Sequence, residues 1–362
     1  MMTPCTRTAR LATAAVVLAA GAALAGARSS ATVPPRPLAP VPPARLSGTG
    51  LFADVAARTL AAGVFPYAPQ YALWTDGAEK RRWIRLPPGA AIDASDPDLW
   101  RFPAGARLWK EFSVGGRPVE MRMMTLGSDG AWTYATYIWA PDRRDASLAP
   151  ESGVRGATES RPGVPYDVPA TADCRACHEG HPAAVLGFSA LQLSPDRDLG
   201  ALHAARAEPG AIDLAGLAAR GLVRNLSPAL LARPPRIDAP TPRARAALGW
   251  LHANCASCHN TRGPLASLGL SFEQRIGAGC SAAGVLTTAV RVPAHFRPGA
   301  QTVRLQPGHP EASLVLARAS SRSPLLQMPP FGTHLVDEEA VALLSAFVRE
   351  DLADGPGDPT SR

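Results

Sequence analysis

The chain has 362 residues, of which 46% are hydrophobic, and a formal net charge of +7. This length allows two or three compact domains, and the hydrophobic fraction excludes wholesale disorder. The positive charge is modest and is borne almost entirely by arginines spread along the chain, so it gives no support for a nucleic-acid partner. The 37 prolines and 32 glycines gather between the periodic segments and predict domains with long loops.

The first residues indicate export. Arg7 and Arg10 precede an apolar run over 11–24, and small residues follow up to Ala27. A basic start, an apolar stretch too short to cross a bilayer comfortably and an A-x-A site are typical of a secretory signal peptide, with an uncleaved membrane anchor as the alternative. Cleavage would remove residues 1–27, which include two arginines and no acid, and would change the net charge from +7 to +5. We therefore expect a periplasmic or secreted mature protein without a stable membrane span.

A linker and a strand-rich domain are expected next. Residues 28–47 are rich in proline and predict an extended linker. From 48 to 148 the chain is strand-like, and its clearest part is three alternating stretches separated by glycine turns, at 108–113, 119–126 and 132–139. Alternating aromatic and β-branched residues between such turns predict an antiparallel meander.

A charged segment at 73–83 precedes these strands. Its acidic and basic residues lie between Trp74 and Trp83. We interpret it as a solvated turn whose tryptophans lie at the edge of the core, because charge runs usually face water. A docking or ligand loop is the alternative.

Four of the six cysteines form two copies of the pattern C-x-x-C-H. The first copy contains Cys174, Cys177 and His178, and the second contains Cys255, Cys258 and His259. This pattern is the attachment signature of c-type haem. Two thiols three residues apart can reach the two vinyl positions along one porphyrin edge, and the following histidine can then ligate the iron. The two motifs predict two covalently attached haem c groups.

Other cysteine chemistry is less consistent with this pattern. A disulfide framework is common in exported proteins, but it does not require the paired spacing or the histidine. One C-x-x-C-H could belong to a zinc or thiol-redox site, whereas two copies behind a signal peptide favour haem. Cys280 remains after Cys5 has left with the signal peptide, and we interpret it as a buried small hydrophobic residue.

The second half of the chain carries both motifs. Residues 149–235 form the first haem-binding region, with a linker at 150–169 and a short helix at 211–222. Residues 236–352 are expected to form an all-α domain, and 353–362 a flexible tail. The predicted fold class is therefore α+β and multidomain, with a β-rich antiparallel N-terminal domain before the two haem-binding parts.

Two helices define the expected C-terminal domain. Thr241 is a plausible N-cap, with Pro242 in the first turn, and Asp337 can cap a last helix that runs to about Asp351. Helical spacing predicts the buried faces, which are Ala244, Ala247, Leu248, Leu251 and Cys255 in one helix and Ala340, Leu343, Leu344 and Phe347 in the other. Two helices that bracket a haem motif and a long loop match the plan of a class I cytochrome c.

The second haem needs two axial ligands. His259 supplies one, and Met328 is the predicted other, because it lies far downstream in a proline-stiffened loop before the last helix. Methionine ligation would also raise the reduction potential. His334 and His252 are the competitors for that face, and His252 lies poorly for it on the motif's own helix.

The first haem has His178 as its expected proximal ligand, but its sixth ligand stays open. The candidates are His181, His203, Met121, Met123 and Met124. His181 is very near the proximal histidine, and Met121 and Met123 alternate on one strand face as core residues do. A five-coordinate iron is the remaining alternative.

The chain resembles a family of exported dihaem c-type cytochromes in which a β-rich N-terminal region precedes two C-x-x-C-H motifs. The matching stretches are 74–86, 102–112, 171–194, 252–264 and 327–337. They are spread along most of the mature chain, and the haem motifs and the Met-Pro-Pro loop are the specific parts. The resemblance implies a haem protein without an assigned role.

We expect a carrier that exchanges electrons with a periplasmic or membrane-bound redox partner, with no catalytic residue assigned. One alternative is an enzyme of the dihaem peroxidase type, in which an open first haem receives electrons from the second. A motif separation of only 81 residues and the β-rich front half argue against it. Another alternative makes the N-terminal domain a ligand-binding module wired to a cytochrome domain.

Overall fold

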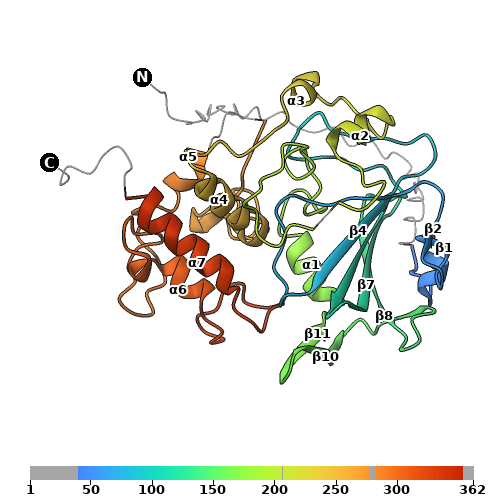
Figure 1. Cartoon of the computed structure of the whole chain (residues 1–362), viewed down its shortest axis with the longest axis horizontal. Helices are drawn as coiled ribbons and strands as arrows, with labels where there is room; N and C mark the ends of the chain where they lie inside the picture. The colour runs from blue at the N-terminus through green and yellow to red at the C-terminus, as the bar shows by residue number, and fades with distance from the viewer. Residues whose placement is uncertain (1–39, 206, 278–281, 354–362) are drawn as a thin grey trace, which may run out of the picture. The chain divides into compact units, whose positions relative to one another are not determined.

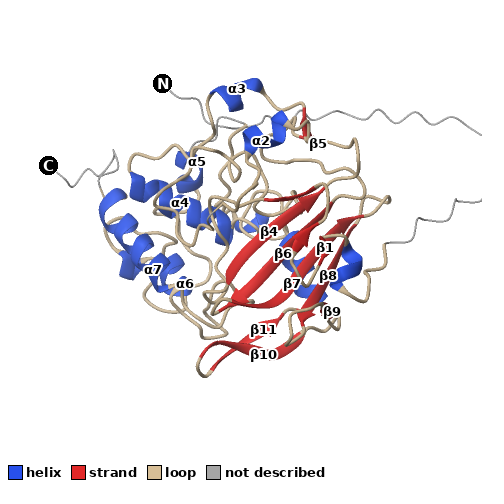
Figure 2. Cartoon of the chain, turned by 45° about the vertical axis from the view of Figure 1, so that its right-hand side comes forward, coloured by secondary structure: helices blue, strands red, loops and turns tan. Residues whose placement is uncertain are grey.

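An antiparallel sheet of six strands forms the centre of the N-terminal part (Figure 2). The computed structural model describes residues 40–205, 207–277 and 282–353. The expected signal peptide, most of the linker, Cys280 and nearly all of the tail therefore lie outside the described residues. The strands, in their spatial order, are β3 (Val64–Pro66), β4 (Glu79–Arg85), β6 (Arg107–Val114), β7 (Arg117–Leu126), β8 (Trp132–Trp139) and β9 (Ala146–Leu148). The predicted meander is confirmed as β6, β7 and β8.

Smaller elements surround this sheet. They are η1 (Leu46–Thr49), β1 (Phe52–Asp54), β2 (Thr59–Leu60), β5 (Ile92–Asp93), β10 (Val154–Arg161), β11 (Val164–Val168), α1 (Thr171–His178), α2 (Leu214–Ala219), β12 (Val223–Arg224) and α3 (Pro228–Ala232). The short helix expected at 211–222 is present as α2, with Asp213 as its N-cap. Leu46 is fully buried, so the folded part begins slightly before residue 48.

Both faces of the sheet are buried, and each has its own core. On one face Trp83, Trp109 and Met121 pack with Leu46 and Phe52 from η1 and β1. The opposite face holds a second core of Ile84, Leu108, Met124, Tyr134 and Phe188, against which Cys174 of α1 packs. Successive side chains of a strand alternate between the two faces of the sheet. One face therefore packs in the core of the N-terminal part, and the other face packs against the first motif.

The linker expected at 150–169 is wrong for most of its length. β10 and β11 pair as an antiparallel hairpin there. Its strands bury few side chains, so the sequence shows no apolar alternation. Asp167 holds the ribbon instead, because its carboxylate accepts hydrogen bonds from the Gly156 amide at 2.7 Å and from Arg155 at 2.8 Å.

The charged segment at 73–83 is not the solvated turn that we expected. Asp76 and Arg82 are only 6% and 5% exposed. The Asp76 carboxylate accepts hydrogen bonds from the amides of His334 and Leu335 at 2.9–3.0 Å. Charged side chains that find partners in a distant part of the chain can be buried, and local sequence does not reveal those partners.

The C-terminal part is helical. It contains α4 (Pro242–Cys255), η2 (Ala266–Leu268), α5 (Ala282–Thr287), η3 (Pro310–Ala312), α6 (Leu314–Ala319), α7 (Glu338–Ala346) and the π-helical turn η4 (Phe347–Asp351). Both predicted caps are confirmed, since Thr241 accepts a hydrogen bond from the Ala244 amide and Asp337 accepts one from the Ala340 amide. The predicted faces of α4 and α7 share one core, in which Leu248 and Leu344 are almost fully buried. Isolated β-bridges such as Val290–Leu305 mean that this part is not purely helical.

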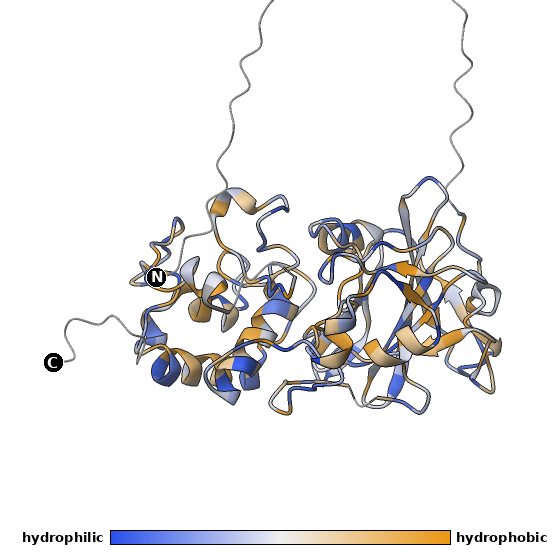
Figure 3. Ribbon diagram, turned by 90° about the horizontal axis from the view of Figure 1, so that it is seen from above, coloured by the Kyte–Doolittle hydropathy of each residue, from blue (hydrophilic) through white to orange (hydrophobic). Residues whose placement is uncertain are grey.

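The helical part and the sheet lie side by side in two views (Figures 1 and 3). Figure 3 shows long hydrophobic stretches on the strands and both hydrophobic and hydrophilic stretches on the helices. Within the described ranges, no helix has the length and apolar character that a membrane crossing needs.

Candidate functional site

A cavity of about 1220 Å³ brings both C-x-x-C-H motifs together. Its walls come from the second face of the sheet, from α1 with the loop after it, and from the loops around α4 and α6. All seven predicted site residues line it, namely Cys174, Cys177, His178, Cys255, Cys258, His259 and Met328. The structure therefore joins residues that are up to 154 positions apart in sequence into one site.

The first motif is carried by the short helix α1. Cys174 and Cys177 are three residues apart, so they lie on one side of the helix and both line the cavity. The start of the helix is held by Asp173, whose carboxylate accepts a hydrogen bond from the Ala170 amide at 3.0 Å. The Thr171 amide donates to the Glu151 carbonyl at 2.8 Å, which ties α1 to the chain before the β10–β11 hairpin.

One ring nitrogen of His178 is held by the backbone and the other stays available to a ligand. Its Nδ1 donates a hydrogen bond to the Ala184 carbonyl at 2.6 Å, so in the neutral ring Nε2 keeps a free lone pair. Burial lowers the pKa of His178 to about 4, with Lys110 and Arg122 adding to the effect. A neutral imidazole with one nitrogen anchored to a carbonyl is the form that binds iron. The ring also lies against Tyr134, with 5.5 Å between ring centroids.

The second motif follows directly from α4. Cys255 is its last residue, and the amides of Cys258 and His259 donate to the Cys255 carbonyl at 3.2 and 2.8 Å. This extra turn presents both cysteines and the histidine to the cavity. His259 Nδ1 is buried without a hydrogen-bond partner, and burial lowers the pKa of the ring.

The four motif cysteines are free thiols, and burial raises the pKa of three of them. Burial raises the pKa of Cys177 to about 11 and that of Cys255 to about 12, and in both cases the nearby Cys258 adds to the effect. Burial also raises the pKa of Cys174. Catalytic thiol-redox motifs have lowered thiol pKa values, so this environment does not favour that chemistry. Among the described residues, no three His, Cys, Asp or Glu side chains come together as a metal cluster.

Met328 lines the same cavity from the loop between α6 and α7. Its amide donates to the Arg318 carbonyl at 3.0 Å, and Gln327 Nε2 donates to the Pro330 carbonyl at 2.9 Å, so the loop is held on both sides of the methionine. The competitor His334 is engaged elsewhere, because its Nε2 lies 3.1 Å from the Asp167 carboxylate. His252 Nδ1 accepts a hydrogen bond from the Gln274 amide at 3.1 Å, which leaves the proton of the neutral ring on Nε2.

The candidates for the sixth ligand of the first haem are separated by the structure. Met121 and Met123 pack in the core on the far face of the sheet, whereas Met124 packs on the face of Cys174. His203 is engaged by the Asp337 carboxylate at 3.0 Å. His181 Nδ1 accepts from the Ala183 amide at 3.0 Å, so its Nε2 carries the proton in the neutral ring. Met123 and Met124 both line the cavity without a competing hydrogen bond. Of the two, Met124 is the one that packs in the same core as Cys174.

The segments after the two motifs are in direct contact. Asn260 Nδ2 donates to the Gly180 carbonyl at 3.1 Å. A side chain at Gly263 would place its Cβ only 2.2 Å from that carbonyl oxygen, and one at Gly180 would place its Cβ 3.1 Å from the Ser257 carbonyl. Glycine at both positions therefore permits the two backbones to approach closely. This contact fixes the spacing of the two motifs.

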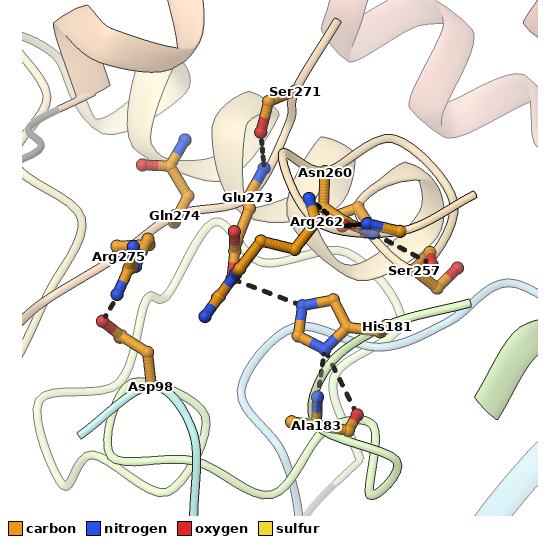
Figure 4. Close-up of polar contacts among 12 residues, drawn as sticks. Asp98, His181, Ala183, Ser257, Asn260, Arg262, Ser271, Glu273, Gln274 and Arg275 are labelled. Carbon is orange, nitrogen blue, oxygen red and sulfur yellow. Dashed lines mark hydrogen bonds and ion pairs between the residues drawn. The ribbon is translucent and has the colours of Figure 1, made fainter. Parts of the chain in front are cut away.

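A polar cluster lies beside this contact (Figure 4). His181 Nε2 is 3.4 Å from Glu273, which also accepts from Arg262 at 3.1 Å. Next to it, Asp98 accepts from the Ile276 amide at 2.9 Å and faces Arg275. The cluster joins the loop after the first motif to the loop after the second.

Sequence reasoning missed Asn260, Gly263 and Glu273. Each follows the second motif within 15 residues, but its partner lies in the N-terminal half or beside the first motif. The position of Asn260 immediately after His259 was the one feature of the sequence that could have indicated its role. A pairing between two loops has no periodicity, so the pattern of the chain did not reveal it.

Comparison with known proteins gives no relative: no family model, no curated protein and no solved structure matches the chain. The residues of the cavity themselves indicate its chemistry. Its volume exceeds the range of about 300–1,000 Å³ that is usual for one small-molecule site. Paired free thiols, two neutral histidines and a methionine around a largely apolar space fit covalently held haem.

Proposed function

We propose that this protein is an exported dihaem c-type cytochrome that transfers electrons to or from a periplasmic or membrane-bound redox partner. The observation that carries the proposal is that both C-x-x-C-H motifs and Met328 line one cavity. The thiols of Cys174, Cys177, Cys255 and Cys258 would hold two haem c groups, and haem supplies reversible one-electron chemistry when bound. The helical part would then be the class I cytochrome c-like domain.

Each axial position has a residue in a suitable state. His178 and His259 are buried and have lowered pKa values, so each offers a neutral imidazole to iron. Met328 would ligate the second haem and raise its potential, because a thioether stabilises the reduced iron. Met124 is the residue best placed to approach the first haem from the sheet.

The packing of the two motifs supports an internal electron relay. Asn260, Gly180 and Gly263 hold the segments after the motifs in backbone contact. Rigid elements that keep two cofactors at a fixed spacing permit electron exchange without a conformational change. The protein's own contribution is to fix ligands, spacing and exposure.

A redox titration followed by optical spectroscopy tests this function. We expect two one-electron centres in the exported protein. Met328→Leu should lower the potential of one centre and abolish its sulfur-to-iron charge-transfer band, because leucine cannot ligate iron. Met121→Leu is the matched control, because Met121 packs in the core on the far face of the sheet, and it should leave that band in place. A single centre, or an unchanged band in Met328→Leu, would contradict the assignment.

The peroxidase alternative has one observation in its favour. In its neutral form, His181 carries the proton on Nε2, so it does not offer that nitrogen to the iron of the first haem. An open first haem next to a polar cluster would suit peroxide chemistry. Peroxide-dependent oxidation of a reduced donor at a catalytic rate would favour this enzyme over a carrier.

A further inference from the structure

Three basic residues lie directly opposite one another on neighbouring strands. Arg82 of β4 pairs with Lys110 of β6, and Lys110 pairs with Arg122 of β7. Side chains in such positions stand about 5 Å apart at their Cβ atoms, and like charges there destabilise a sheet. We name these three residues the cationic row.

The cationic row faces the cavity. Lys110 lies on the same strand face as Leu108, and Arg122 lies on the same face as Met124, because side chains two residues apart share a face. All three members of the row line the cavity. The row is also within electrostatic reach of the first motif, since Lys110 and Arg122 contribute to the lowered pKa of His178.

The positive charge of the row is not balanced by the protein. Arg122 forms an ion pair with Glu120 at 2.5 Å, and the Tyr166 hydroxyl donates to the same carboxylate at 2.6 Å. Across the described ranges, neither Arg82 nor Lys110 has a side-chain hydrogen bond or an ion pair, although the Lys110 ammonium lies 4.8 Å from the centre of the Phe112 ring. When all three side chains of the row are protonated, one carboxylate faces three cations and two positive charges are left over.

Without a ligand, the unbalanced charges of the cationic row lower the stability of the folded protein. Arg82 is only 5% exposed, and burial lowers its pKa. Burial and the neighbouring cations Arg82, Lys80 and Arg122 also hold the pKa of Lys110 well below its usual value. Buried charges in proteins are normally paired, so a ligand with negative charge would remove this cost.

We propose that the cationic row is an anion-binding site, which takes a carboxylate or another small oxyanion next to the first haem motif. Two excess positive charges match one dianion or two carboxylates. Lysine and arginine donors on adjacent strands can both reach such oxygens, and hydrogen bonds between charged groups are the strong kind. The anion has two sources: the propionates of the first haem, or a small anion that diffuses in. The proposal rests on the proposed function only for the first of these sources.

The test uses the exported holoprotein and starts with a haem count on every preparation. Isothermal titration calorimetry with acetate and with inorganic phosphate measures a free anion site, whether or not the first motif holds haem. Redox-difference infrared spectra measure the carboxylate bands of the haem propionates. A missing first haem would appear in the haem count and would count against the proposed function alone.

Three variants distinguish the row from a general charge effect. Arg82→Gln and Lys110→Met each remove one cation of the row. Arg81→Gln is the matched control, because Arg81 is the next residue of β4, points to the other face and pairs with Glu208. Arg82→Lys keeps the charge and should retain the behaviour of the natural protein.

If the site binds a diffusing anion, we expect saturable binding of acetate or phosphate. The affinity should then weaken roughly tenfold or more in Arg82→Gln and Lys110→Met and by less than about twofold in Arg81→Gln. If the site binds the haem propionates, we expect no saturable binding of acetate or phosphate. The carboxylate bands should then shift in the two row variants and not in the control. Either result supports the site and identifies its source. Absence of saturable binding together with unchanged carboxylate bands in both row variants would overturn the proposal.

Discussion

The histidines of this cavity differ in the hydrogen bond that the Nδ1 atom of each ring makes. His178 donates from Nδ1 to a carbonyl and keeps Nε2 for a ligand, whereas His181 and His252 accept at Nδ1 from backbone amides. The sequence predicted His178 from its motif but could not exclude the other two. Their tautomers depend on the amides of Ala183 and Gln274, and the sequence does not reveal the contact between Gln274 and His252.

His252 should make the protein sensitive to acid. Burial and the nearby His181 lower its pKa from 6.5 to about 4, while Glu273 acts in the opposite direction. In the unfolded chain this ring takes a proton below pH 6.5, but in the folded protein it stays neutral until about pH 4. The free energy of unfolding should therefore fall as the pH drops through this window, by on the order of 3 kcal/mol.

Denaturant unfolding between pH 7 and pH 4 measures this effect. His252→Asn keeps an acceptor for the Gln274 amide but does not titrate, so its unfolding free energy should fall less over the window. His309→Asn, at an exposed position, is the control, and its unfolding free energy should fall as much as that of the natural protein. If the unfolding free energy fell equally in His252→Asn and in the natural protein, His252 would not be the source of the acid sensitivity.

At the scale of elements, Gly249 lets the N-terminal part pack on α4. A Cβ at this position would lie 1.9 Å from the ring of Tyr71, whose hydroxyl donates to Asp198 at 3.1 Å. Tyr71 is 3% exposed and cannot move aside freely. Alanine would gain up to about 1 kcal/mol of helix propensity, but we expect overpacking to exceed that gain and to leave a net loss of about 1–3 kcal/mol.

Equilibrium denaturation of Gly249→Ala tests this prediction. The double variant Tyr71→Leu with Gly249→Ala should lose less stability than the sum of the two single variants, because the smaller side chain relieves the clash. A Gly249→Ala protein as stable as the natural one would mean that the contact is loose.

The elements that the sequence predicted well are those with strong local signals. β6, β7 and β8 alternate between two buried faces, and α4 and α7 carry both a cap and an apolar stripe. The β10–β11 hairpin was missed because its side chains are mostly exposed and show no alternation. The same limit applies to the segment at 73–83, because the buried carboxylate of Asp76 is held by backbone amides more than 250 positions away.

At the scale of the whole molecule, the sequence predicted seven candidate haem-binding residues but not that they share a cavity. These residues come together through contacts between loops, such as Asn260 with Gly180 and His181 with Glu273. It also depends on the second face of the sheet, which supplies the wall that carries the cationic row. The N-terminal sheet is therefore part of the site, and its role was left open by local patterns alone.

The central claim is that two haem groups are attached to one chain and share this cavity. The intact mass of the exported protein, with haem quantified on the same sample, tests it most directly. We predict the mass of the chain without residues 1–27 plus two haem groups, and the loss of one group in a variant with alanine at Cys174 and Cys177. One haem per chain, with Cys174 and Cys177 unmodified, would contradict the account and would leave a monohaem carrier.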